Sequence, residues 1–135
     1  MIGINKYKTG QRLVGAVADA NAFNSYLTDD LLVPETQITL LLDDQATRAG
    51  IISAFQALSK DDRIAFGDPI VIFYAGHGSE MTPPPDRVVN GPLVQCIIPQ
   101  DAGTTGVVVA PIPDYTLGAL INQIASAKGD NIVSS

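Results

Sequence analysis

Apolar residues occur along the chain in two patterns, as short unbroken runs and as stripes at helical spacing. Unbroken apolar runs are typical of buried strands, and they predict strands near residues 1–4, 37–42, 70–75 and 131–133. Stripes of apolar residues at helical spacing predict helices near residues 14–28, 47–59 and 114–128. Strands that alternate with amphipathic helices favour an α/β fold, here a three-layer αβα sandwich around a mostly parallel sheet.

The ends of two predicted helices carry capping signals. Thr47 is expected to cap the second helix at its N-terminus, and Asp114 the third. The pair Lys128-Gly129 should close the third helix, because glycine readily follows a helix C-terminus.

The segments between the main elements are less regular. The run at 70–75 has no polar alternation, so we expect a central strand covered by helices on both faces. Prolines and glycines predict an irregular loop over residues 80–92. Residues 93–98 are expected to add a short strand.

Length and composition restrict the class of protein. The chain has 135 residues, 46% of them hydrophobic and 16% charged, which predicts one folded domain over residues 1–135. It has 14 acidic against 8 basic residues, a formal charge of −6, which disfavours nucleic acid as a partner. The longest strongly apolar run, residues 69–75, is far shorter than the roughly 20 residues of a membrane-spanning helix, so no membrane insertion is expected.

Cysteine and histidine each occur once in the chain. A single cysteine, Cys96, cannot form an internal disulfide, and no leader of signal-peptide type is visible, so a reducing, cytoplasmic setting is expected. One histidine and one cysteine also exclude a zinc cluster built from several soft ligands.

His77 is the first candidate for chemistry. It lies in Gly76-His77-Gly78, where the buried run at 70–75 ends, and in parallel sheets catalytic groups gather at the carboxyl ends of strands. Flanking glycines leave backbone N–H groups free to stabilise a developing negative charge. The simpler alternative is a histidine held by a neighbouring carbonyl in a tight turn.

Asp19 is the second candidate. Helix geometry places it on the shoulder of the stripe formed by Ala16, Ala20 and Phe23, so we expect it to be partly buried. Near the start of its helix, it should share a sheet edge with His77, and its carboxylate could bind a cation. The alternative is a solvated carboxylate favoured by the helix dipole.

Cys96 invites comparison with a Cys–His dyad, in which an imidazole activates a thiol. It lies within an apolar run, however, and not at a strand end beside glycines. Free cysteine in such a position usually behaves as a small buried hydrophobe, so Cys96 is expected to be structural.

Several motifs occur in a fixed order along nearly the whole chain. They are Gly3-Ile4-Asn5-Lys6-Tyr7, Leu13-Val14-Gly15-Ala16-Val17-Ala18-Asp19-Ala20, Ala46-Thr47-Arg48, Gly67-Asp68, Tyr74-Ala75-Gly76-His77-Gly78-Ser79, Ile98-Pro99-Gln100-Asp101, Ile112-Pro113-Asp114 and Lys128-Gly129-Asp130-Asn131-Ile132. In these motifs the chain resembles the caspase-like cysteine peptidases, specifically the large-subunit region of metacaspases of fungal type.

The resemblance implies a caspase-hemoglobinase fold of Rossmann-like type. His77 then matches the catalytic histidine, and the Gly78 amide matches one oxyanion donor. Asp19 matches an acidic residue of the pocket that selects Arg or Lys before the scissile bond of a peptide or protein substrate.

The chain departs from the family pattern at the same pocket and after the Gly-His-Gly motif. Ala16 and Ala75 replace small polar residues that often line the pocket. The acidic run associated with calcium is absent after Gly78, so we expect no cofactor and no metal site, and the resemblance leaves a calcium requirement open.

The largest departure is at the C-terminal side. In the family, the strand that begins here at residues 131–133 continues into an Asp-Cys-Cys-His-Ser type motif that carries the nucleophile, whereas this chain reads Ser134-Ser135. The small-subunit region that completes the sheet is not represented either. We therefore expect a domain that is incomplete at its C-terminal side and inactive alone.

Three functions are compatible with these observations. The preferred one is the large-subunit part of a caspase-like endopeptidase that cleaves after Arg or Lys through an acyl-enzyme. The alternative is a non-catalytic caspase-like module that binds a partner through an unpaired sheet edge. A nucleotide-binding α/β domain is disfavoured because no Gly-x-Gly-x-x-Gly or phosphate loop follows the first strand.

Overall fold

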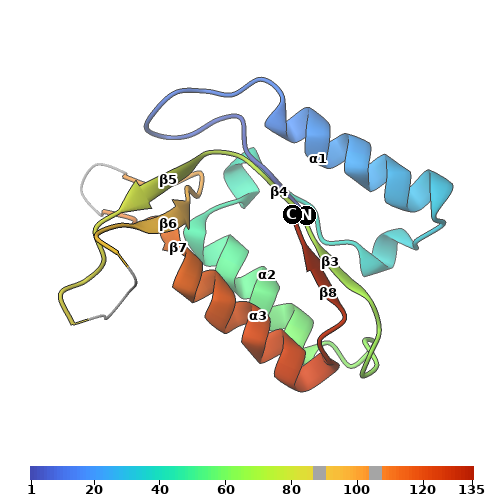
Figure 1. Ribbon diagram of the computed structural model, residues 1–135. Coiled ribbons are helices and arrows are strands. Elements are labelled where there is room, and N and C mark those ends of the chain that lie inside the picture. Colours follow the sequence, from blue (N-terminus) through green and yellow to red (C-terminus); the bar gives the residue numbers. More distant parts are fainter. Residues whose placement is uncertain (87–90, 104–107) are drawn as a thin grey trace.

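A parallel sheet forms the middle layer of the computed structural model, which describes residues 1–86, 91–103 and 108–135 (Figure 1). β1 (Ile2–Gly3) lies between β2 (Leu41–Leu42) and β4 (Tyr74–Ala75), with both pairings parallel. β3 (Ile70–Ile72) pairs in parallel with β8 (Ile132–Ser134). β3 and β4 are one segment of chain that changes partner at Phe73, so the predicted strand at 70–75 is present in two parts.

Helices cover the sheet from both sides, which confirms the αβα sandwich. α2 (Arg48–Lys60) and α3 (Asp114–Lys128) lie side by side on one face, and α1 (Ala16–Ser25) lies on the other (Figure 1). α1 packs very close to β1, since a Cβ added at Gly3 would lie 2.7 Å from the Ala20 Cβ. Small residues at this crossing allow the close approach.

The hydrophobic core lies mainly between the sheet and the α2–α3 pair. Its fully buried members include Ile4, Ile51, Ile112 and Ile124. Burial of each such side chain contributes about 1.5–3 kcal/mol, so this layer provides most of the driving force for folding.

On the α1 side the sheet is only partly covered. α1 contacts β1 and β4, whereas Val71 of β3 and its neighbour Val133 of β8 are 44% and 62% exposed. The prediction that the strand at 70–75 is covered on both faces is therefore wrong at Val71. One short helix is too narrow to cover all the strands.

The predicted strand at 37–42 is also largely wrong. Residues Glu35–Gln37 form a 3₁₀ turn, in which the Ile38 N–H donates to the Glu35 carbonyl at 3.0 Å. Only the last two residues, β2, reach β1. The short β1 offers few backbone partners, so the apolar residues before β2 remain outside the sheet.

A second, antiparallel sheet follows β4. β5 (Gly78–Met81) pairs with β6 (Val94–Ile97), and β6 pairs with β7 (Ile112–Pro113). The extra strand expected within 93–98 is confirmed as β6. The loop predicted over 80–92 begins later than expected, because β6 supplies a partner that pairs residues 80 and 81, and part of that loop lies outside the described residues.

The helix ends match their signals in most cases. The Thr47 Oγ1 accepts from the Gly50 N–H at 3.0 Å, so the predicted cap of α2 is confirmed. α3 ends at Lys128 before Gly129, whose φ of +91° suits glycine. Asp114 is the first residue of α3 and Pro113 the cap, so the predicted cap is displaced by one position.

The predicted first helix at 14–28 starts later and continues differently. α1 begins at Ala16, and after Ser25 the chain runs on as one π-helical turn, Tyr26–Asp30. Val14 remains outside the helix and is 95% exposed.

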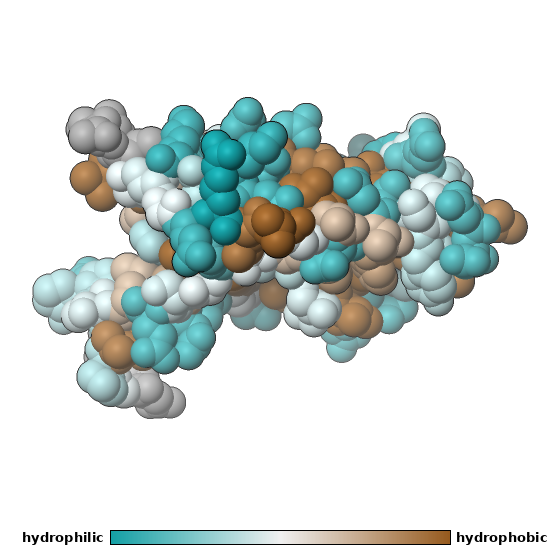
Figure 2. Space-filling model, turned by 90° about the horizontal axis from the view of Figure 1, so that it is seen from above, coloured by the Kyte–Doolittle hydropathy of each residue, from teal (hydrophilic) through white to brown (hydrophobic). Residues whose placement is uncertain are grey.

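Hydrophobic side chains are interspersed with hydrophilic ones on the face seen in Figure 2. The exposed large hydrophobics include Val14, Leu32 and Phe66, which belong to different segments. In the described parts of the chain, none of the helices combines the length and apolarity that crossing a membrane requires.

Candidate active site

His77 lies at the carboxyl edge of the parallel sheet. β4 ends at Ala75, and His77 follows after one glycine, Gly76. β1 and β4 run in parallel, so the loop after β1 and the turn after β4 leave the sheet at the same edge. The predicted position of His77 is confirmed.

Two tyrosines hold the main chain of His77 from opposite sides. The His77 N–H donates to the Tyr7 hydroxyl at 2.7 Å. The Tyr74 hydroxyl donates to the His77 carbonyl at 2.8 Å and lies 3.1 Å from the Ile98 carbonyl. Burial is the main reason why the pKa of Tyr74 lies far above its usual value, so this phenol remains a donor.

Gly76 is required between the two tyrosines. A Cβ added at this position would lie 2.6 Å from the Tyr74 hydroxyl and 2.7 Å from the Tyr7 hydroxyl. Neither contact can be accommodated without moving a hydroxyl that contacts His77. Steric contact with the two hydroxyls therefore explains why a glycine precedes His77 in this turn.

The imidazole of His77 is half-buried and bonded on one side. Its Nε2 lies 2.8 Å from the Gln11 carbonyl oxygen. A carbonyl only accepts, so this contact favours the tautomer with the proton on Nε2 and leaves the Nδ1 lone pair available among the described residues. The ring also lies against that of Tyr7, with centroids 4.7 Å apart and planes inclined by 42°.

The loop that supplies Gln11 is anchored at several points. The Leu13 N–H donates to the Asn5 carbonyl at 2.9 Å. The Thr9 Oγ1 donates to the Ala102 carbonyl at 2.6 Å, which ties the loop to the segment after β6. The Asp43 carboxylate accepts from the Asn5 N–H at 2.8 Å, so the start of the loop is fixed as well.

Gly78 begins the edge strand β5. The His77 carbonyl accepts from the Ile98 N–H at 2.9 Å, which is one of the two bonds of a hydrogen-bonded position just before the β5–β6 ladder, since the His77 N–H goes to Tyr7 instead. Because bonded and non-bonded pairs alternate, the next pair, Gly78 with Ile97, turns its N–H groups outward. The Gly78 N–H therefore lies on the outer edge, next to the catalytic candidate, as an oxyanion donor requires.

Asp19 lies in the first turn of α1, on the sheet edge where the sequence places it. The prediction that it is partly buried is wrong, because its side chain is exposed. α1 contacts the sheet through Ala16 and Ala20 along a narrow stripe. Asp19 lies outside this stripe and stays in solvent.

Cys96 is buried in β6, at 5% exposure, as expected for a structural cysteine. Its Sγ donates to the Ser79 carbonyl at 3.3 Å across the β5–β6 ladder. Burial raises the pKa of the Cys96 thiol, which disfavours the reactive thiolate. The hydrogen bond of the imidazole goes to Gln11 instead, so the two side chains do not form a dyad in this structure.

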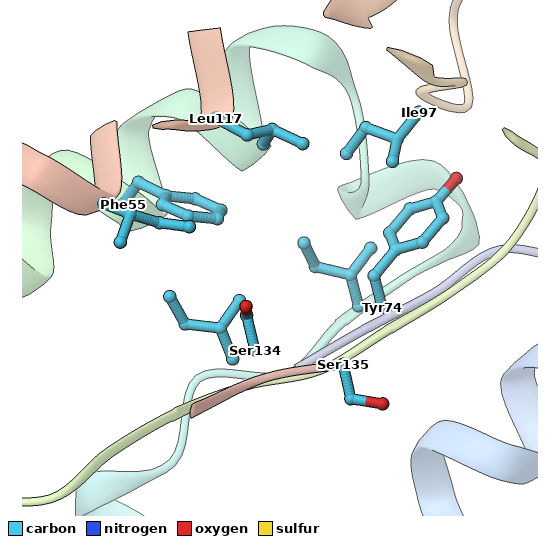
Figure 3. Close-up of a pocket in the computed structure, with 9 residues that line it drawn as sticks. Phe55, Tyr74, Ile97, Leu117, Ser134 and Ser135 are labelled. Atoms are coloured by element: carbon cyan, nitrogen blue, oxygen red, sulfur yellow. The ribbon is translucent and has the colours of Figure 1, made fainter. Parts of the chain in front are cut away.

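An apolar cavity of about 260 Å³ lies between the sheet and the α2–α3 pair (Figure 3). Phe55 and Leu117 contribute from the helices, Ile97 from β6, and Tyr74 from β4. Tyr74 is the one ionisable side chain of its lining, and its hydroxyl is already bonded to His77. The cavity thus has little capacity for acid–base chemistry of its own.

Three residues of this site, Gln11, Tyr7 and Tyr74, were not singled out by the sequence analysis. Gln11 acts through its main-chain carbonyl, which no side-chain pattern reveals. Tyr7 could have been found, because it ends the motif Gly3-Ile4-Asn5-Lys6-Tyr7 and lies in the same loop. In the described residues, no three or more His, Cys, Asp or Glu side chains gather as a metal site would need.

Comparison with known proteins identifies the family of the chain. The sequence profile of the caspase domain matches residues 1–125. Metacaspase-7 of Arabidopsis thaliana is 30% identical over 139 aligned positions, which cover 99% of this chain and 32% of that protein. Metacaspase-1 of Saccharomyces cerevisiae (strain S288c) is 31% identical over 81% of this chain and 26% of its own length. The chain spans a third or less of these relatives.

A solved structure supports the fold. A crystal structure from Geobacter sulfurreducens superimposes with a TM-score of 0.68 over 98% of this chain and 45% of that one. At 19% identity, this likeness concerns the fold alone.

Proposed function

The chain belongs to the caspase domain family of cysteine peptidases, and we propose that it is the large-subunit part of an endopeptidase that cleaves after Arg or Lys. In this proposal residues 1–135 form one domain, whose small-subunit region and nucleophile lie elsewhere in the complete enzyme. The observation that carries it is the His77 imidazole at the sheet edge, with Nε2 bonded to Gln11 and Nδ1 left available.

The chemistry assigned to this chain is proton transfer and charge stabilisation. The Nδ1 of His77 accepts the proton of a cysteine thiol, and the resulting thiolate attacks the scissile carbonyl. His77 then gives this proton to the leaving amine as the peptide bond breaks. The Gly78 N–H donates to the oxyanion of the tetrahedral intermediate. The acyl-enzyme that forms is released by water, for which His77 again acts as base.

The chain alone is proposed to be inactive. His77 and Gly78 supply a base and an oxyanion donor, but the Cys96 thiol is buried and bonded to Ser79. No other cysteine occurs in the chain. The test is incubation with fluorogenic peptides ending in Arg, Lys or Asp: no turnover is expected, and turnover that disappears in Cys96→Ala would overturn this part.

Substrate preference rests on Asp19. An exposed carboxylate on the sheet edge that presents His77 attracts a guanidinium or ammonium group and repels a carboxylate. Neither a cofactor nor a metal is part of the proposal. The proposal also places the protein in a reducing, cytoplasmic compartment, because its single cysteine cannot form an internal disulfide.

A non-catalytic protein-binding module is the second candidate. β8 pairs only with β3 among the described strands, and its Val133 is 62% exposed, so one edge of the parallel sheet is open to a partner strand. The sequence of the transcript after the Ser135 codon discriminates between the two. An Asp-Cys-Cys-His-Ser type motif in frame supports the peptidase, whereas a stop codon supports the module.

A further inference from the structure

Tyr7 contacts His77 with both parts of its side chain. Its hydroxyl accepts the His77 N–H at 2.7 Å, and its ring lies against the imidazole, with centroids 4.7 Å apart. The two residues are 70 positions apart in the sequence, and Tyr7 is 8% exposed. One side chain from the loop after β1 thus contacts the main chain and the ring of the candidate base.

The direction of each hydrogen bond follows from the available protons. The Tyr74 hydroxyl has one proton, and its two carbonyl neighbours, those of His77 and Ile98, can only accept. A backbone N–H can only donate, so a lone pair of the Tyr7 oxygen points to the His77 N–H.

We propose that Tyr7 is a positioning residue that sets the orientation and tautomer of the His77 imidazole. The Tyr7 hydroxyl holds the His77 main chain, from which the imidazole side chain starts. The Tyr7 ring blocks rotation of the imidazole away from Gln11. With the ring held there, Nε2 stays within hydrogen-bond distance of the Gln11 carbonyl, and Nδ1 remains the free nitrogen. Only the later role of Nδ1, as the base in catalysis, rests on the proposed function.

A purely structural role for Tyr7 predicts different behaviour. Tyr7 also belongs to the hydrophobic core, so its replacement lowers stability under either view. The tautomer of His77 is a readout that core packing alone does not change. The chain contains a single histidine, so its imidazole nitrogens give an unambiguous NMR signal.

The experiment measures the His77 tautomer in the ¹⁵N-labelled 135-residue chain at a pH where the imidazole is neutral. The variants are Tyr7→Phe, which keeps the ring, and Tyr7→Leu, which removes it. Tyr26→Phe is the matched control, because Tyr26 is 48% exposed and lies beyond the end of α1. Amide hydrogen exchange at His77 is recorded on the same samples, and no catalytic turnover is needed.

In the wild type, the ratio of the Nε2–H to the Nδ1–H tautomer should be roughly fivefold higher than in the urea-unfolded chain, because the hydrogen bond to Gln11 favours the Nε2–H tautomer by the net free energy of one hydrogen bond. Tyr7→Leu should return the ratio to within about twofold of the unfolded value. Tyr7→Phe should give an intermediate ratio and roughly fivefold faster exchange of the His77 amide. Tyr26→Phe should match the wild type in both.

A folded Tyr7→Leu chain with the wild-type tautomer ratio would overturn the proposal. If that variant does not fold, Tyr7→Phe decides: a wild-type ratio together with wild-type exchange at His77 contradicts the positioning role. Because these readouts involve no substrate, a chain that fails every peptidase test can still confirm or refute the role of Tyr7.

Discussion

The Nε2 of His77 and the main-chain oxygen of Gln11 lie 2.8 Å apart, although 66 positions separate them in the chain. This contact joins the loop after β1 to the turn after β4. In the proposed mechanism, this contact selects in advance the nitrogen of the imidazole that acts as base, so less reorganisation is needed when a substrate binds.

Replacing Gly76 should destabilise the turn that carries His77. Gly76→Ala places a Cβ 2.6 Å from one tyrosine hydroxyl and 2.7 Å from another, so we expect the free energy of unfolding to fall by about 1–3 kcal/mol. Gly118→Ala is the control, because nothing lies within 4 Å of the added Cβ in α3. It should raise stability by roughly 0.5–1 kcal/mol in the same urea titration. Equal effects at both sites would contradict the steric role of Gly76.

Cys96 should react slowly with alkylating agents in the folded chain. Its thiol is buried, and burial raises its pKa, so the thiolate fraction at neutral pH is small. We expect iodoacetamide to modify the folded chain on the order of tenfold or more slowly than the urea-unfolded chain, with the rate rising as pH increases. Mass spectrometry measures the modified fraction, and equal rates in the two states would refute the buried position of this thiol.

The ion pair of Asp61 with Arg63 should contribute to stability in a defined pH range. Side-chain and main-chain hydrogen bonds from Arg63 lower the pKa of Asp61 from 3.8 to about 2. A lowered carboxylate pKa stabilises the folded state above the unfolded pKa, and this contribution is lost as pH falls through the folded value. The stability difference between wild type and Asp61→Asn should thus be constant above about pH 5 and shrink between about pH 4 and 2.

Denaturation series across this pH range provide the measurement. Asp62→Asn serves as the control, because Asp62 is the exposed neighbour. Arg63 is largely exposed, so 1 M salt should weaken the contribution of the pair by screening. A difference that grows as pH falls would have the wrong sign for this ion pair.

Asp19→Asn should reduce the preference for basic substrates in a form of the protein that is extended through a nucleophile motif. The carboxylate is exposed, so we expect the ratio of kcat/KM for Arg- over Asp-terminated peptides to fall by up to about fivefold. Asp30→Asn removes the same charge beyond the far end of α1 and should leave the ratio unchanged. An unchanged ratio in Asp19→Asn would make Asp19 a surface carboxylate without a role in specificity.

The sequence predicts the architecture well and its details unevenly. Three helices and the apolar runs that form β1, β3, β4 and β8 follow from their hydrophobic patterns, because each turns at least part of its apolar residues toward a neighbouring layer. β5 could not be foreseen, since Gly78-Ser79-Glu80-Met81 has no strand pattern and is extended only because β6 lies beside it. The 3₁₀ turn before β2 likewise depends on how few residues of β1 are available for pairing.

Those features of the site that depend on where a strand ends were predictable from the sequence. Those that depend on main-chain atoms were not. The position of His77 follows from the end of an apolar run beside glycines. The carbonyl of Gln11 carries no signal in its residue type, and the exposure of Asp19 depends on how narrow the contact between α1 and the sheet is. Sequence periodicity gives the direction of a side chain, but its burial is decided by how far the neighbouring layer extends.

The role of His77 is tested most directly by the activity of the extended form, with and without its imidazole. We expect that form to hydrolyse Arg-terminated peptides, and His77→Ala to lower kcat/KM by about 10²–10⁴ because the proton-transfer group is lost. The half-buried side chain makes one hydrogen bond, so circular dichroism and the melting temperature should remain close to wild type. Wild-type turnover by a folded His77→Ala variant would contradict the assignment of His77 as the catalytic base.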